Sequence, residues 1–129
     1  MDLNQITLPA KDMAASIAFY ETLGLRLIVH THDRYARFEC PMGSTTVSLH
    51  AVDADAPVAG VSVYFEVADV DDQVARLKRA GLTFQTDPVD QRWLWREAWL
   101  TDPAGNRVAL YYAGPNRRFP PWRKEPAPD

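Results

Sequence analysis

Carboxylate, imidazole and indole side chains fall on short stretches of this chain in which apolar and polar residues alternate. Glu97 and His50 are of the residue types that transfer protons near neutral pH, and they are the candidate catalytic residues. Trp95 and Trp99 alternate in phase with Glu97 and offer flat faces for stacking. This combination suits the binding or turnover of a small molecule, although no motif of known spacing joins Glu97 to His50.

A repeated pattern of residues indicates which elements position these side chains. Asp12 and Gly24 are twelve residues apart, and so are Asp69 and Gly81. Between each pair, apolar residues recur every three or four positions, as on one face of an amphipathic helix. Aspartate is a preferred helix N-cap, and glycine accepts the left-handed backbone that ends many helices. The pattern therefore predicts two equivalent helices within an internal repeat.

Short alternating stretches before and after each helix predict strands. One strand precedes each helix, at about 5–9 and 61–67. Three strands follow it, at about 25–30, 35–40 and 45–50 in the first copy and at about 83–86, 95–101 and 107–112 in the second. Each copy carries Pro-x-Gly between its third and fourth strands. The sequence thus predicts an α+β fold of two tandem βαβββ modules, about 3–51 and 60–113, in a single domain spanning 1–129 with a C-terminal tail at 114–129.

One helix cannot cover a four-stranded sheet, so we expect the two modules to form a curved mixed sheet around a cleft. Because side chains alternate along a strand, one set faces the helices and the other lines the cleft. The helix-facing set is Ile6, Leu8, Ala36, Phe38, Val47, Leu49, Val61, Val63, Phe65, Ala98, Leu100, Val108 and Leu110. The candidate ligand-binding residues in the cleft are Thr7, Arg37, Glu39, Tyr64, Glu66, Trp95, Trp99, Arg107 and Tyr111.

The composition excludes several classes of partner. The formal net charge of −3 draws the protein neither to nucleic acid nor to anionic membranes. The single cysteine, Cys40, excludes an internal disulfide and a thiolate zinc cluster. The N-terminus lacks the basic and apolar regions of a signal peptide, and no apolar run is long enough to span a bilayer. We expect a cytoplasmic protein.

The two copies together resemble the vicinal oxygen chelate superfamily, which includes glyoxalase I, bleomycin-resistance proteins and extradiol dioxygenases. Residues 5–12, followed by Phe-Tyr at 19–20 and Leu-Gly at 23–24, are similar to its opening signature. The turn Asp-Pro-Ala-Gly-Asn at 102–106 is similar to its second-module turn. The resemblance covers about residues 3–113, and it implies the glyoxalase-like fold with a small-molecule site in the cleft.

The same resemblance implies where a metal would bind, because the superfamily's metal takes a ligand from the first and the last strand of each module. These positions hold Gln5, Ser48, Ser62 and Ala109 in this chain. Glutamine is a ligand in some glyoxalases, whereas a hydroxyl is a poor ligand and a methyl group is none. We therefore expect no metal or other cofactor. The alternative is a displaced site for a divalent metal, formed by Gln5, His50 and Glu97.

Three functions remain open. The first is a metal-free, ligand-sequestering protein of the bleomycin-resistance kind, which would stack a flat or cationic molecule on Trp95 and Trp99 beside the glutamates. The second is a glyoxalase-like lyase or isomerase, or a dioxygenase, with the displaced metal site and Glu97 as the base. The third is a structural or interaction module. Arg37 and Arg107 either bind an anionic group of the ligand or pair with the glutamates.

The unprotected sheet edges and the short cleft indicate a homodimer. The sequence leaves open whether the modules pair within one chain or across a swapped dimer. In the tail, Phe119 and Trp122 are expected to dock on the domain or on a partner copy.

Overall fold

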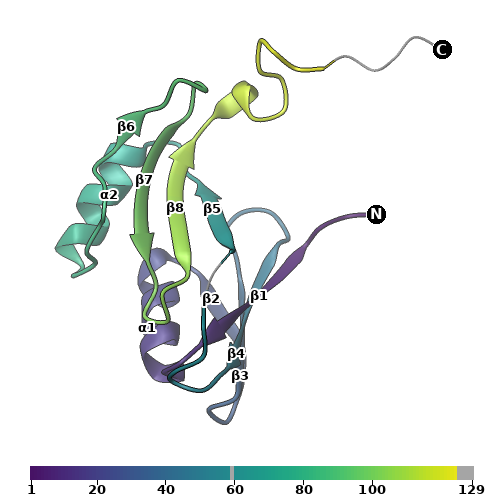
Figure 1. Cartoon of the computed structure of the whole chain (residues 1–129), viewed down its shortest axis with the longest axis vertical. Coiled ribbons are helices and arrows are strands. Elements are labelled where there is room, and N and C mark those ends of the chain that lie inside the picture. The colour runs from purple at the N-terminus through teal and green to yellow at the C-terminus, as the bar shows by residue number, and fades with distance from the viewer. Residues whose placement is uncertain (59, 125–129) are drawn as a thin grey trace.

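The first module of the computed structural model is a four-stranded sheet with one helix (Figure 1). The structure describes residues 1–58 and 60–124. The sheet contains β1 (Gln5–Ala10), β2 (Arg26–Thr31), β3 (Tyr35–Glu39) and β4 (Thr46–Ala51), and α1 (Met13–Leu23) follows β1. The strand order is β1-β4-β3-β2, with β1 parallel to β4 and the other pairs antiparallel. We call this the first sheet.

The second module repeats this arrangement. Its strands are β5 (Ser62–Glu66), β6 (Val89–Asp90), β7 (Arg96–Thr101) and β8 (Arg107–Tyr112), and its helix is α2 (Val70–Arg79). The order β5-β8-β7-β6, with β5 parallel to β8, reproduces the order of the first sheet. We call this the second sheet. The predicted α+β fold of two βαβββ modules is thus confirmed.

The helix boundaries lie where the repeated aspartates and glycines predict them. Asp12 Oδ1 accepts a hydrogen bond from the backbone N–H of Ala15 at 3.1 Å, and Asp69 Oδ1 accepts one from that of Asp72 at 3.0 Å. Gly24 ends α1 with φ 113°, a conformation that residues with a side chain rarely adopt. These caps satisfy backbone groups that the terminal helical turns leave unpaired.

The second module departs from the predicted strand boundaries at one place. The sequence predicts a strand at 83–86, but these residues form a loop, and the corresponding strand is the two-residue β6. The backbone N–H groups of Gln85 and Thr86 both donate to the carbonyl of Trp99, at 2.8 and 3.4 Å, instead of alternating along a ladder. Pro88 follows and has no N–H to donate. The prediction is wrong because this short edge segment beside a proline does not keep a regular register.

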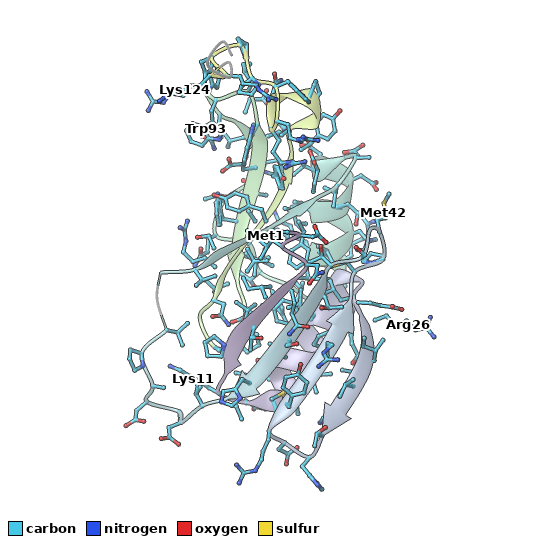
Figure 2. The ribbon with its side chains drawn as sticks, turned by 90° about the vertical axis from the view of Figure 1, so that its right-hand side faces the viewer. Met1, Lys11, Arg26, Met42, Trp93 and Lys124 are labelled. Atoms are coloured by element: carbon cyan, nitrogen blue, oxygen red, sulfur yellow. The ribbon has the colours of Figure 1, made fainter. Side chains whose placement is uncertain are left out.

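The two modules meet through the sides of their sheets that carry the helices. One apolar core contains Phe38 and Leu49 of the first module together with Leu100 and Val108 of the second. In Figure 1, α1 lies behind the β7–β8 end of the second sheet, and in Figure 2, turned by 90°, it lies behind the strands of the first sheet. Both sheets therefore share α1, and the opposite face of each sheet points away from this core. We call these opposite faces the polar faces.

The sequence leaves open whether the two polar faces form a cleft within one chain or across two chains. The predicted helix-facing residues are buried or half-buried, except Val61, which is 46% exposed just before β5. In the part of the chain that the structure describes, however, no hydrogen bond joins the polar face of one sheet to that of the other. β1 and β5 each pair with one strand and leave an open edge. Within one chain, the two polar faces are thus not joined by hydrogen bonds among the described residues.

A buried carboxylate fixes the contact between the modules. Asp102 Oδ2 accepts hydrogen bonds from the hydroxyl of Tyr20 and from Asn106 Nδ2, both at 2.6 Å, and Asn106 Nδ2 also donates to the carbonyl of Pro9 at 2.9 Å. Asp102 Oδ1 accepts from the backbone N–H groups of Ala104 and Asn106. Burial raises the pKa of Tyr20 far above its usual range, and the charge of Asp102 adds to this shift. The Tyr20 phenol is therefore a permanent donor.

The equivalent place in the repeat lacks this contact. Tyr20 lies eight residues after Asp12, whereas the residue eight after Asp69 is Leu77, and Cys40 precedes its Pro-x-Gly turn where Asp102 precedes the other. Leu77 and Cys40 instead line an apolar cavity of about 850 Å³. Burial raises the pKa of the Cys40 thiol. One half of the repeat thus has a buried polar contact where the other borders a cavity.

The C-terminal segment begins as a short 3₁₀ helix, η1 (Gly114–Asn116). The expected docking of Phe119 and Trp122 is not made on the chain's own domain, because each side chain is 58% exposed. The guanidinium of Arg123 lies 4.5 Å from the centre of the Phe119 ring, so the tail packs mainly on itself. Residues 125–129 of the predicted tail lie outside the described residues. None of the described helices has the length and hydropathy needed to cross a bilayer.

Candidate functional site

Four aromatic rings form a cluster on the polar face of the second sheet. Tyr64 of β5 meets Trp95, Trp99 and Tyr111 edge-on, with ring centroids 5.8, 5.2 and 5.4 Å apart. Trp95 and Tyr111 are more nearly parallel, at 31° and 4.8 Å. We call these four residues the aromatic cluster. Tyr64 is 45% exposed, so the cluster presents ring surface to solvent or to a ligand.

The small side chain of Ala109 makes room for this cluster. Tyr64 on β5 and Trp99 on β7 lie opposite Ala109 of the intervening strand β8. Two strand spacings would separate them by about 10 Å, but their ring centroids are only 5.2 Å apart. The rings therefore lean towards each other over Ala109, which is fully buried.

Glu97 lies beneath the rings and is held by two indoles. It is 4% exposed, and its two carboxylate oxygens accept hydrogen bonds from Trp93 Nε1 at 2.7 Å and Trp99 Nε1 at 3.0 Å. Trp93 reaches Glu97 because the turn before β7 closes with Gln91 N–H on the carbonyl of Trp95 at 2.7 Å. The non-glycine residue Leu94 takes a φ of 69° in this turn. The carboxylate of Glu97 therefore holds both indole rings in place, and each of its two oxygens accepts a hydrogen bond.

Two further charged groups border the aromatic cluster. The guanidinium of Arg107 stacks 4.2 Å from the Trp99 ring centre, and its Nη1 donates to the hydroxyl of Ser62 at 3.3 Å. Glu66 Oε2 accepts from the backbone N–H groups of Ala113 and Gly114, at 2.7 and 2.9 Å. Glu66 thereby fixes the start of η1, whose Asn116 carbonyl accepts from Trp95 Nε1 at 3.3 Å.

The phenols of the cluster are neutral hydrogen-bond donors near pH 7. Burial raises the pKa of Tyr64, and the nearby charge of Glu97 raises it further while Arg107 opposes the shift. Burial also raises the pKa of Tyr111, with a contribution from Glu66. Both hydroxyls therefore stay protonated, and they can donate to a ligand that covers the rings.

The polar face of the first sheet carries a second set of connected side chains. The hydroxyls of Tyr35 and Ser48 are 2.7 Å apart, and Arg37 Nε donates to the Tyr35 oxygen at 3.0 Å. The bond with Ser48 lowers the pKa of Tyr35, and Arg37 contributes in the same direction. Thr7 lies beside Ser48 in the sheet register. This set is separate from the aromatic cluster within one chain.

The candidate residues from the sequence are divided between the two polar faces. Tyr64, Trp95, Trp99, Tyr111, Glu66, Glu97 and Arg107 gather on the second sheet, and Thr7, Arg37, Glu39 and His50 lie on the first. Glu39 is 3.9 Å from Arg26 in an exposed ion pair. The exposed His50 pairs in register with Pro9 and Tyr35, whereas Glu97 pairs with Val89 and Tyr111. The proposed catalytic pair is thus not brought together within one chain.

The side chains at the implied metal positions do not fit a divalent ion. The Ser48 hydroxyl is engaged with Tyr35, Gln5 Oε1 accepts from Thr46 Oγ1 at 2.9 Å, and Ala109 is covered by rings and has no donor atom. The displaced site fits no better, because both oxygens of Glu97 already accept indole N–H groups. Within residues 1–58 and 60–124, no three His, Cys, Asp or Glu side chains gather as metal ligands would.

Sequence reasoning missed three residues of these faces. Tyr35 has no motif that marks it, but it alternates in phase with Arg37 along β3 and could have been placed with it. Trp93 precedes β7, so only the turn geometry shows that its indole reaches Glu97. Asn116 contributes a backbone carbonyl, for which a sequence carries no signal.

Comparison with known proteins places this geometry in a family. The model of the glyoxalase/bleomycin resistance protein/dioxygenase superfamily matches residues 2–110. The chain belongs to this superfamily. The resemblance in the sequence is thereby confirmed, and the superfamily's characteristic βαβββ repeat is the one described above.

Individual proteins of known sequence or structure are similar to this chain. An uncharacterised protein of Mycolicibacterium smegmatis is 30% identical over 111 residues, which cover 85% of this chain and 92% of that protein. The crystal structure of a glyoxalase/bleomycin resistance protein/dioxygenase from Nocardioides is similar with a TM-score of 0.76 and 22% identity, covering 97% of this chain and 90% of that one. A bleomycin-binding protein complexed with bleomycin is similar with a TM-score of 0.67 and 22% identity, covering 88% and 99%.

Proposed function

We propose that this protein binds a planar, aromatic small molecule and sequesters it without chemical change. The observation that carries this proposal is the aromatic cluster, whose rings are held by edge contacts and by the bonds of Glu97 to Trp93 and Trp99. A preorganised ring surface binds a flat ligand with little loss of side-chain freedom. The superfamily member that binds bleomycin is a precedent for small-molecule binding on this fold.

We further propose that binding needs no metal. The donor set at the four implied positions is one amide and two hydroxyls, and all three have hydrogen-bond partners of their own in the chain. A metal-dependent lyase, isomerase or dioxygenase would need ligands that these positions lack. The thiol of Cys40, which is not in a disulfide, suits the reducing conditions of the cytoplasm.

Titration calorimetry with naphthalene-2-carboxamide, a neutral planar compound, tests this function. We expect saturable binding and a rise in melting temperature, because a ligand that binds the folded state stabilises it by mass action. EDTA in the buffer should change neither the affinity nor the melting temperature. Absence of binding, or binding that EDTA abolishes and zinc or nickel restores, would contradict the proposal.

The packing of the modules supports a homodimer. The polar faces of one chain point away from the shared core, so a cleft with two walls requires the first sheet of one copy and the second sheet of another. The open edges of β1 and β5 and the exposed Phe119 and Trp122 offer further surface for such a partner. We propose that two copies form two equivalent clefts related by a two-fold axis.

Light scattering at tens of micromolar protein tests this assembly. We expect twice the mass of one chain, and we expect dilution that dissociates the dimer to weaken binding of the naphthalene compound. A monomer at all concentrations, with unchanged affinity, would contradict the two-chain cleft.

A further inference from the structure

We propose that the ligand carries an anionic group, a carboxylate or a phosphate, and that Arg37 binds this group with the help of Tyr35 and Ser48. The inference rests on the proposed function, since it assumes that the first sheet forms the second wall of the cleft. It reverses the preference for cationic ligands that the glutamates of the sequence suggest.

The acidic side chains of the polar faces are all engaged. Both oxygens of Glu97 accept indole N–H groups, and one oxygen of Glu66 accepts two backbone N–H groups. Glu39 lies in an ion pair with Arg26. These carboxylates therefore already accept hydrogen bonds or lie in an ion pair within the protein.

The arginines of the polar faces have no such partners. Among the described residues, neither Arg37 nor Arg107 lies within ion-pair distance of a carboxylate. The guanidinium of Arg107 stacks on the ring of Trp99, and the indole N–H of Trp99 donates to Glu97. The same ring therefore contacts both the positive charge of Arg107 and the negative charge of Glu97. Arg37 has no acidic neighbour across its strands, because it lies opposite Ser48 and Val29. Arg37 is thus a cation of the polar faces that no carboxylate of the described residues pairs with.

The geometry around Arg37 suits an oxyanion. Its Nε donates to Tyr35 at 3.0 Å, and the hydroxyl of Tyr35 is in turn fixed by the fully buried Ser48. This leaves the two terminal nitrogens of a half-buried, oriented guanidinium, which have no hydrogen-bond partner within residues 1–58 and 60–124. Paired N–H groups of this kind match two oxygens of a carboxylate or phosphate. Tyr35 acts as a positioning residue, because it holds the Nε edge.

The test compares three ligands that share one ring system: naphthalene-2-carboxylate, 2-naphthyl phosphate and the neutral naphthalene-2-carboxamide. Calorimetry on the full chain should give at least about tenfold tighter binding of one or both anions than of the amide, since charge-assisted bonds are about twice as strong as neutral ones. Arg37→Gln should remove this preference, because it weakens binding of the anions more than binding of the amide. The matched control is Arg34→Gln, an exposed arginine in the β2–β3 turn of the same sheet, which should keep the preference.

Two further variants separate charge from geometry. Arg37→Lys keeps the charge without the paired N–H groups, and Tyr35→Phe keeps the charge and the ring without the oxygen that holds Nε. Each should weaken binding of the anions about three- to tenfold and affect the amide affinity less. If Arg37→Gln does not fold, as judged by circular dichroism, these two variants decide the question.

The outcomes distinguish this inference from the proposed function. Equal binding of the anions and the amide, or a preference that survives in Arg37→Gln, would overturn the anion site and leave ring binding intact. If none of the naphthalene compounds binds, the proposed binding of a planar ligand is wrong. Inorganic phosphate then tests the anion site by itself. Phosphate should raise the melting temperature of the wild-type protein and not of Arg37→Gln, and equal shifts would overturn the site.

Discussion

Replacing Asp102 by alanine should destabilise the protein by about 3–5 kcal/mol, because it removes the shared acceptor of a buried network. The carboxylate accepts four hydrogen bonds, from Tyr20, Ala104 N–H, Asn106 N–H and Asn106 Nδ2. Without it, the buried hydroxyl of Tyr20 has no acceptor, and an unpaired buried group costs about 1–3 kcal/mol by itself. The Tyr20 contact also joins the modules, so its loss should loosen the core that they share. Chemical denaturation measures the difference.

Two matched variants control for this result. Asp87→Ala removes an exposed carboxylate that pairs with Lys78 at 2.9 Å, and it should cost less than about 0.5 kcal/mol. Tyr20→Phe removes one bond of the network and should cost about 1–2 kcal/mol. A denaturation midpoint for Asp102→Ala equal to that of Asp87→Ala would show that the network does not hold the modules together.

Replacing Trp99 by alanine should weaken binding of the planar ligand at least tenfold, which is about 1.4 kcal/mol. Three effects act in the same direction. A stacking face is lost, Tyr64 loses the ring that it meets at 5.2 Å, and Glu97 loses the indole N–H at 3.0 Å. Ala109 also becomes exposed, so the face loses its continuous ring surface. Calorimetry with the neutral naphthalene compound measures the change without relying on tryptophan emission.

The tail supplies a matched control, because Trp122 is 58% exposed and lies outside the aromatic cluster. Trp122→Ala should leave ligand affinity within about twofold of the wild type, since an exposed residue outside a site contributes little. Trp99→Phe keeps a ring but not the N–H, and it should fall between the wild type and Trp99→Ala. Equal affinities for the wild type and Trp99→Ala would place the ligand somewhere other than on the aromatic cluster.

Local interactions made the modules predictable from the sequence. Asp12 and Asp69 cap their helices with backbone groups three residues away, and Gly24 ends its helix through its own backbone freedom. The alternation of side chains along a strand also depends only on neighbouring residues. It therefore predicted which strand residues are buried and which lie on the polar faces. The predicted strand at 83–86 is instead a loop. Its backbone N–H groups donate to the carbonyl of Trp99, a residue outside this segment, so neighbouring residues did not reveal the loop.

The tertiary structure decided what the sequence left open, because its deciding contacts join distant residues. The alternation of Glu66 and Glu97 placed them on a polar face, but only the fold shows that backbone and indole N–H groups occupy them. The repeat predicted two paired modules, whereas the apolar core and the bond from Tyr20 to Asp102, across 82 positions, decided that they meet through the sides of their sheets that carry the helices. Residue types and spacing thus determined the elements and their faces. Hydrogen-bond partners depended on which elements pack together, and so did the terminal nitrogens of Arg37, which have no partner among the described residues.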